Sequence, residues 1–199
     1  MSNKVRILVA IAVILGGASV AHAQCFIGGD ITAVLNSDPY GPAWVYTLTI
    51  TWDNDVVFDL SHMDLILDAV GGSCTLADFY THLSWPDPIG TSDGVGGCTV
   101  EYYGELSANG DPSIPGVTGI LLKFEPYENG CEPDDVGTAT FVFYSDLAPV
   151  PVDEDILSVV DKFAGMYCFG HLTGLFPGMD CDPVDSQAQS WGSVKSTFR

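Results

Sequence analysis

The amino-acid sequence predicts an all-β fold: an antiparallel β-sandwich, immunoglobulin-like or jelly-roll-like, with about seven strands held together by disulfides. Three observations support this expectation. Short segments alternate apolar and polar residues, clusters of Gly, Pro, Asn and Asp separate them, and the chain contains six cysteines. Alternation with a period of two places one face of each strand in a core and the other in water. Two such sheets are therefore expected to share one core.

The clearest strand is Trp44–Trp52, in which Trp, Tyr, Leu, Ile and Trp alternate with Val and three Thr residues. β-Branched and aromatic residues at this period are typical of a half-buried strand. The same pattern predicts strands over residues 27–35, 62–67, 99–106, 120–125, 138–144 and 166–172. Two short helices are expected, at residues 75–82 and 153–160. The acidic run Asp153-Glu154-Asp155 suits the N-terminus of the second helix.

The first 23 residues have the pattern of a secretory signal peptide. A basic start, residues 1–6, precedes an apolar run over residues 7–20, and the small residues Ala21 and Ala23 follow. The apolar run is shorter than the ~20 residues that a membrane-spanning helix needs. We therefore expect cleavage after Ala23 and no membrane span in the mature protein. The expected location is secreted, periplasmic or at the cell surface.

Cys25 is not expected to carry a lipid, because Gln24 precedes it where a lipoprotein signal needs a small residue. Residues 24–181 are expected to form the sandwich, and residues 182–199 a polar C-terminal tail. An even number of cysteines in an exported chain predicts three disulfides. The cysteines have no C-x-x-C spacing, so a zinc ribbon is not predicted. Of fifteen pairings, the preferred set is Cys74–Cys98, Cys168–Cys181 and Cys25–Cys131.

The chain is strongly acidic, with 26 Asp and Glu residues, six Lys and Arg residues, and a net charge of −20. Such a surface repels nucleic acid and anionic lipid, so nucleic-acid binding is excluded. The acidic residues either keep the protein soluble or bind structural Ca²⁺ through clustered carboxylate oxygens. The candidate calcium ligands lie in two acidic turns, and a hydrated turn is the competing explanation for each. These residues are Asp53, Asp55, Asp180, Asp182 and Asp185.

A long segment, residues 69–97, has no predicted strand of its own and is rich in aromatic residues. Its exposed aromatic side chains could stack on sugar rings or enter the pocket of a partner. The alternative is that they form a small local core against the sheet edge. The candidate ligand-binding residues are Phe79, Tyr80, His82 and Trp85.

The sequence contains no G-x-S-x-G, H-E-x-x-H, P-loop or G-x-G-x-x-G motif. Ser61 directly precedes the predicted strand that holds His62 and Asp64. Consecutive residues there point to opposite faces, so the three residues do not predict a catalytic triad. His62 and Asp64 share a face and are expected to form a solvated pair. The double-proline turn Gly110–Gly116 is assigned no chemistry.

Several stretches, among them "YTLTITWD", "GDPSIPGVTGILLKFEP", "GTATFVFYSD" and "SWGSVKSTFR", resemble uncharacterised secreted bacterial proteins. Those proteins begin with a signal peptide and end in a Trp-Gly-x-x-Lys-x-x-x-Arg tail, which Trp191, Gly192, Lys195 and Arg199 match. The resemblance implies a bacterial exported β-protein without catalytic residues. It also implies that the tail is read by sorting or docking machinery; the alternative is an amphipathic tail lying on the domain.

The sequence therefore predicts an exported, non-enzymatic β-sandwich that acts as a surface, matrix or interaction module, without a cofactor. A protein or glycan at the cell surface is its expected partner. The alternative function is a carbohydrate- or calcium-binding module that uses residues 75–97 or the acidic turns.

Overall fold

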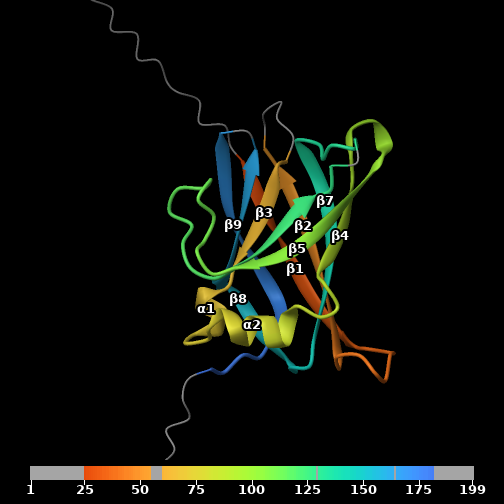
Figure 1. Cartoon of the computed structure of the whole chain (residues 1–199). Coiled ribbons are helices and arrows are strands. Elements are labelled where there is room, and N and C mark those ends of the chain that lie inside the picture. The colour runs from red at the N-terminus through yellow and green to blue at the C-terminus, as the bar shows by residue number, and fades with distance from the viewer. Residues whose placement is uncertain (1–24, 55–59, 129, 164, 182–199) are drawn as a thin grey trace, which may run out of the picture.

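The computed structural model describes residues 25–181 except 55–59, 129 and 164, and these residues form an all-β fold of nine strands with two short α-helices (Figure 1). The elements are β1 (Phe26–Leu35), β2 (Trp44–Asp53), β3 (His62–Ile66), α1 (Asp68–Gly71), α2 (Leu76–Leu83), β4 (Ile89–Asp93), β5 (Thr99–Ser107), β6 (Leu121–Pro126), β7 (Val136–Ser145), β8 (Pro149–Phe163) and β9 (Met166–Pro177). The predicted all-β class is confirmed.

The strands close into one barrel, in the order β1-β2-β7-β4-β5-β6-β3-β8-β9. All neighbouring pairs are antiparallel except β1 and β9, which pair in parallel and close the ring. The predicted seven-stranded sandwich is therefore wrong. The physical reason is that β4 and β8, which were not predicted as strands, join what would otherwise be two separate sheets.

Glycines allow the chain to close along the β1–β9 pairing. A Cβ atom on Gly170 would lie 1.6 Å from the carbonyl oxygen of Ile27. Gly174 has φ +117°, and a Cβ there would lie 2.1 Å from the carbonyl oxygen of Ile31. Backbone atoms of neighbouring strands approach too closely here for any side chain, so only glycine fits.

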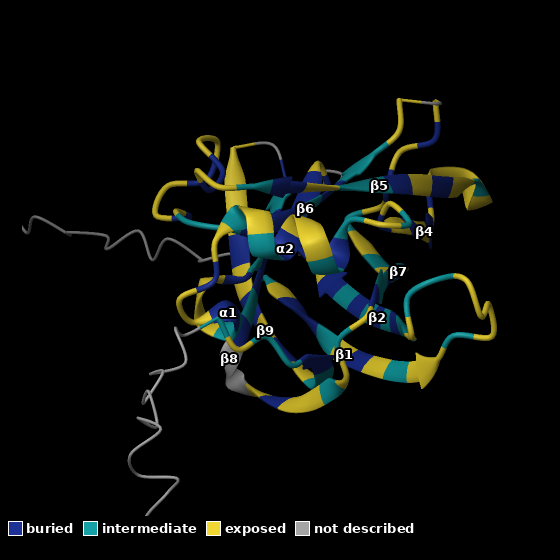
Figure 2. Cartoon of the chain, turned by 60° about the horizontal axis from the view of Figure 1, so that its bottom comes forward, coloured by how far each residue is buried: buried dark blue, intermediate teal, exposed yellow. Residues whose placement is uncertain are grey.

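Inward residues of every strand except β4 form the main core, and buried positions alternate with exposed or intermediate ones along strands such as β5 (Figure 2). Aromatic rings fill its centre: Tyr46 stacks on Phe143 with centroids 5.0 Å apart, and Phe124 meets Phe141 at 4.2 Å. The helices lie across one end of the barrel (Figure 1), where Phe79 of α2 enters this core. The outer face of the barrel is therefore free to carry polar sites.

The predicted helix at residues 75–82 is confirmed as α2. Thr75 and Asp78 form a reciprocal capping box, which satisfies backbone N–H groups at its N-terminus. The helix predicted at residues 153–160 is wrong, because these residues belong to β8. Leu157 and Val159 point into the barrel and satisfy a period of two. Among the described residues, no helix has the length and hydropathy to cross a bilayer.

Three disulfides are present, as predicted, but all three predicted pairings are wrong. The bonds are Cys25–Cys168, Cys74–Cys181 and Cys98–Cys131. Cys25 does tie the N-terminal strand to the body, through β9 instead of through Cys131. The predicted pairings favoured cysteines close in sequence, whereas barrel closure brings together residues 143 and 107 positions apart. Three disulfides indicate an oxidising, extracellular compartment.

Candidate functional site

The aromatic residues predicted as ligand contacts take different environments. Phe79 is fully buried in the main core, which agrees with the alternative that these aromatic residues pack in a core and do not bind a ligand. The Tyr80 hydroxyl donates to the Leu106 carbonyl at 3.3 Å, and Nδ1 of His82 lies 2.7 Å from Oδ1 of Asp146. Trp85 is 75 % exposed. Phe79 therefore cannot contact a ligand at the surface, and only part of this set remains available.

The acidic turns predicted to bind calcium are only partly described. Asp53, at the end of β2, and Asp180 are exposed. Asp55, Asp182 and Asp185 lie outside the described residues, and calcium binding at these turns stays a prediction. The tail residues Trp191, Gly192, Lys195 and Arg199 and the predicted signal peptide lie outside them as well.

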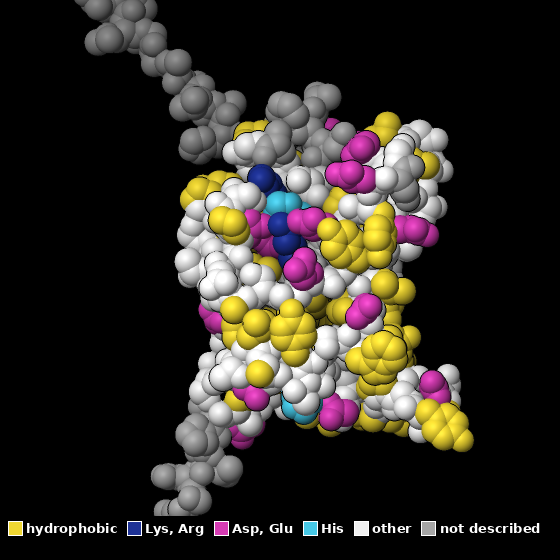
Figure 3. Space-filling view, in the orientation of Figure 1, with side chains coloured by type: hydrophobic (Ala, Val, Ile, Leu, Met, Phe, Trp, Pro, Cys, Tyr) yellow, Lys and Arg dark blue, Asp and Glu magenta, His cyan; other side chains and the backbone are white. Residues whose placement is uncertain are grey.

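A different polar cluster lies on the outer face of β3, β6 and β8. Because Met63 and Leu65 point into the core, His62 and Asp64 point outward. Asp64 is opposite Lys123 on β6, and His62 is opposite Lys162 on β8. These two lysines are the basic residues of the described chain, apart from histidines. Figure 3 shows Lys and His side chains gathered among acidic ones on this face.

The loop of residues 108–120, between β5 and β6, covers this face. Ile114 and Val117 of the loop pack on Leu121 and Val160, forming a second small core outside the barrel. The loop is closed at its base by a hydrogen bond from Gly110 N to the Gly119 carbonyl, 2.7 Å long. The second core thus holds the loop, and Asp111 within it, against the strands.

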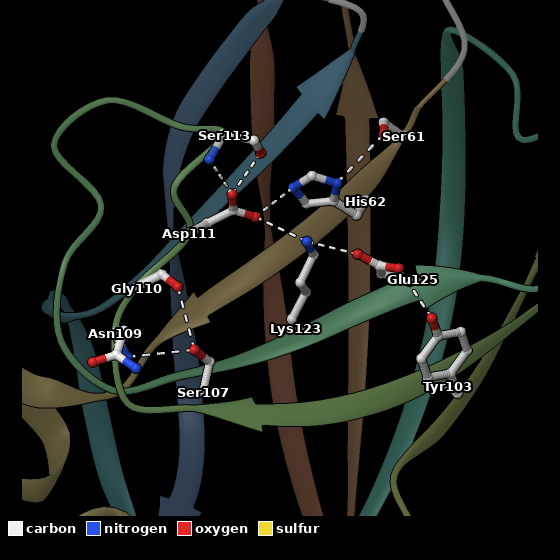
Figure 4. A network of polar contacts seen from close by, with 10 residues as sticks. All are labelled: Ser61, His62, Tyr103, Ser107, Asn109, Gly110, Asp111, Ser113, Lys123 and Glu125. Atoms are coloured by element: carbon white, nitrogen blue, oxygen red, sulfur yellow. Dashed lines mark hydrogen bonds and ion pairs between the residues drawn. The ribbon is translucent and has the colours of Figure 1, made fainter.

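Asp111 is the centre of the cluster (Figure 4). Its Oδ1 accepts a hydrogen bond from Ser113 N at 2.6 Å. Its Oδ2 lies 2.9 Å from Nε2 of His62 and 3.0 Å from Nζ of Lys123. The Lys123 ammonium also contacts Oε1 of Glu125 at 2.6 Å. We call His62, Asp64, Asp111, Lys123 and Glu125 the polar cluster.

Burial and neighbouring charges shift the pKa values of the polar cluster strongly. Burial, then the negative charge of Asp111, raises the pKa of Asp64 to about 7. Burial alone would raise the pKa of Asp111, but hydrogen bonds from Ser113 and Lys123 outweigh it and hold that pKa far below its ordinary value. Burial, then the charge of Lys123, lowers the pKa of His62 to about 4. His62 is therefore neutral at pH 7.

Asp64 is the least satisfied member of the polar cluster. Its side chain is fully buried, and neither oxygen of the carboxylate has a hydrogen-bond donor. Only the protonated acid could form a hydrogen bond, by donating to Asp111. One ligand atom each from His62, Asp64 and Asp111 lies within 4.8 Å of the others, and no second group of this kind occurs among the described residues. The three residues have the types and spacing of metal ligands.

The expected solvated pair of His62 and Asp64 is wrong, because both side chains are buried and His62 contacts Asp111 instead. The turn Gly110–Gly116, for which the sequence predicts no chemistry, supplies the central residue. Asp111, Lys123 and Glu125 were missed as site residues. One available signal was the lysine–glutamate alternation of β6, since lysine is rare in this chain.

Ser61, His62 and Asp111 form a line of the residue types found in a Ser-His-Asp triad. Ser61 Oγ lies 3.4 Å from Nδ1 of His62, near the upper limit for a hydrogen bond. Because the pKa of His62 is lowered to about 4, it is a weak general base at neutral pH. The arrangement is poorly suited to activating Ser61.

Two pockets flank the polar cluster. The larger has a volume of about 490 Å³ and is lined by Leu60, Ser61, His62, Glu125, Pro126, Glu128, Gly130 and Glu132. The smaller, of about 170 Å³, is lined by Glu105, Ser107, Gly110, Asp111, Pro112, Lys123 and Glu125. Glu125 lines both pockets. We call the larger one the acidic pocket, because three glutamates line it.

A second buried carboxyl lies inside the barrel and predicts a pH-dependent stability. Asp161 on β8 is fully buried, accepts a hydrogen bond from Cys168 N at 3.1 Å, and has its pKa raised to about 7 by burial. The unfolded carboxyl has a pKa of about 3.9. Between these values the folded state holds a proton that the unfolded state has released, so stability falls as pH rises.

Asp161→Asn should remove this dependence. Relative to the variant, the wild type is expected to lose up to about 4 kcal/mol between pH 4 and pH 8, most of it below pH 7. Urea unfolding of both proteins across this range measures the difference in their free energies of unfolding. Because both proteins contain Asp64, its contribution cancels in this difference. Parallel stability curves for the two proteins would show that Asp161 is ionised in the fold.

No protein-family model matches this sequence, and no curated protein is significantly similar to it. Functional conclusions therefore rest on the polar cluster and the pockets beside it.

Proposed function

We propose that this protein is an exported, non-enzymatic interaction module whose acidic pocket receives a cationic group of its partner. The observation that carries this proposal is the convergence of Glu125, Glu128 and Glu132 on one pocket of about 490 Å³. That volume is within the range of small-molecule binding sites. Several carboxylates around one hollow favour an amine or a guanidinium, such as a Lys or Arg side chain.

The charges around the pocket support a cationic ligand. His62, which lines it, is neutral at pH 7. The ammonium of Lys123 is engaged by Asp111 and Glu125. The carboxylates of Glu128 and Glu132 therefore keep the pocket negative. The net charge of −20 adds a long-range field that draws cations towards the molecule.

The expected export is supported by the three disulfides, which persist in oxidising compartments. The non-enzymatic role is supported by the low pKa of His62 and the long contact from Ser61. The carbohydrate alternative now depends on Trp85 and Tyr80, the exposed aromatics of the 75–97 segment.

Calorimetry with tetralysine as the probe, at 150 mM NaCl, tests the cationic pocket. Glu128→Gln together with Glu132→Gln is expected to weaken binding at least about tenfold, because two carboxylates of the pocket lose their charge. The matched control, Asp30→Asn with Glu101→Gln, removes two exposed charges elsewhere and should change binding less than about twofold.

An equal loss in both double variants would mean that tetralysine senses only the overall charge, and the pocket proposal would fail. Turnover of an ester, glycoside or peptide substrate that Ser61→Ala abolishes would contradict the non-enzymatic role.

A further inference from the structure

We propose that His62, Asp64 and Asp111 bind a divalent transition-metal ion of the Zn²⁺ type on the outer face of β3. This inference goes beyond the acidic pocket and does not depend on it. The three side chains come from two elements far apart in sequence, strand β3 and the 108–120 loop. Figure 4 shows two of them, His62 and Asp111. All three are buried, with exposed fractions of 4 %, 0 % and 3 %.

The distances fit a small ion once the ligand atoms that lie farther apart, at up to 4.8 Å, move closer together. Zn²⁺ bonds to nitrogen and oxygen are about 2.0 Å long, so neighbouring ligand atoms in a tetrahedron are about 3.3 Å apart. Nε2 of His62 and Oδ2 of Asp111 are 2.9 Å apart, and all three ligand atoms lie within 4.8 Å. The His62 nitrogen makes no aligned hydrogen bond to Asp111. The His62 nitrogen and the Asp111 oxygen are therefore close together without bonding to each other, which is the arrangement of two ligands of one ion.

Asp64 provides the independent observation that points to a ligand. Buried polar groups are nearly always hydrogen-bonded, because leaving one unpaired costs free energy. Asp161, the buried carboxyl inside the barrel, at least accepts a hydrogen bond from Cys168. Neither oxygen of the Asp64 carboxylate has a donor. A cation between Asp64, His62 and Asp111 would satisfy it and would neutralise the repulsion between the two carboxylates.

The donor set selects the kind of ion. Ca²⁺ takes six to eight oxygen ligands in most sites, whereas Zn²⁺ accepts imidazole nitrogen and carboxylate oxygen in a four-coordinate site. One imidazole and two carboxylates therefore favour Zn²⁺ over Ca²⁺. Three protein ligands leave a fourth position for a water molecule or for a group from a ligand.

Lys123 competes with the ion for Asp111. Its ammonium lies 3.0 Å from Oδ2 of Asp111, and it also contacts Glu125 at 2.6 Å. When the ion binds, Lys123 can leave Asp111 and keep Glu125. Replacing Lys123 with methionine removes a like charge from the site, so the affinity for Zn²⁺ should rise. A purely structural role of the polar cluster predicts no such gain.

Calorimetric titration of the oxidised, EDTA-treated protein with ZnCl₂ tests the proposal. We expect one Zn²⁺ per chain and weaker binding of CaCl₂. Asp64→Asn should weaken Zn²⁺ binding about 100-fold or more, since it removes a ligand. The matched control, Asp161→Asn, changes the other buried carboxyl of about pKa 7 and should leave the affinity within about threefold. Lys123→Met should bind Zn²⁺ at least about tenfold more tightly.

His62→Gln is a second ligand variant, and circular dichroism establishes that each variant is folded. Equal Zn²⁺ affinity in the wild type, Asp64→Asn and His62→Gln would overturn the proposal, as would a loss of affinity in Lys123→Met. The pocket variant Glu128→Gln with Glu132→Gln should bind Zn²⁺ as the wild type does. Failure of the metal site and failure of the acidic pocket are thereby distinguished.

Discussion

Gly170→Ala is expected to destabilise the protein by more than about 3 kcal/mol, a large effect for the addition of one methyl group. The added Cβ would lie 1.6 Å from the carbonyl oxygen of Ile27. That neighbour is backbone on β1, so it cannot move away as a flexible side chain could. The parallel pairing of β1 and β9 that closes the barrel would have to separate, which exposes core residues.

Urea or thermal unfolding measures this effect, and a loss of about 3 kcal/mol corresponds to a fall in Tm of roughly 6–12 °C for a chain of this size. Gly165→Ala is the matched control: Gly165 lies in the same β8–β9 hairpin, and a Cβ there would meet nothing within 4 Å. Similar stabilities for Gly170→Ala and Gly165→Ala would contradict the closure of the barrel between β1 and β9.

Asp111→Ala is expected to cost about 3 kcal/mol, because it removes a buried carboxylate that accepts hydrogen bonds and a charged contact, although Lys123 keeps its contact with Glu125. The substitution removes the contacts of Asp111 with His62 and Lys123 and its hydrogen bond from Ser113. The 108–120 loop should then separate from the barrel. Hydrogen exchange of peptides that contain Ile114 and Val117 should accelerate in the EDTA-treated variant.

Asp38→Ala is the control for the loop prediction. Asp38 makes the same kind of local turn, with Oδ1 accepting from the backbone N of the residue two positions on, at 2.9 Å, but it is exposed in the β1–β2 hairpin. Its replacement should cost about 1 kcal/mol or less. If the two alanine variants lose the same stability, the buried contacts of Asp111 contribute nothing beyond its turn.

The difference between the predicted sandwich and the observed barrel comes from two strands. The seven predicted strands correspond to β1, β2, β3, β5, β6, β7 and β9. In the observed order they would make two sheets, β9-β1-β2-β7 and β5-β6-β3, which is a sandwich. β4 fills the gap between β7 and β5, and β8 fills the gap between β3 and β9.

In both missed strands the apolar pattern of the inward positions is interrupted. In β4 the buried positions are Gly90 and Ser92. A Cβ on Gly90 would lie 2.2 Å from the ring of Phe141, so the partner strand supplies the bulk. In β8 the inward position between Val159 and Phe163 is Asp161, and the acidic run that begins at Asp153 resembles a helix start. The apolar pattern of β4 is thus incomplete where a side chain of a neighbouring strand fills the core, and the pattern of β8 is interrupted by a buried carboxyl.

The polar cluster could be predicted only in part, for a related reason. Period-two alternation correctly placed His62 and Asp64 on one face of a strand. Their burial depends on the 108–120 loop, whose position is fixed by Ile114 and Val117 packing on Leu121 and Val160. That contact is tertiary and has no local sequence signal. The disulfide pairings were missed for the same cause, since barrel topology decides which cysteines meet.

The central claim is that the polar cluster is a built binding site, and anomalous diffraction tests it most directly. Crystals of the oxidised protein grown with Zn²⁺ and measured at the zinc absorption edge should show one peak bonded to His62, Asp64 and Asp111, with Lys123 turned to Glu125. A zinc peak confined to exposed carboxylates such as Asp53 or Asp180, with the contacts of Asp111 to His62 and Lys123 intact, would contradict it.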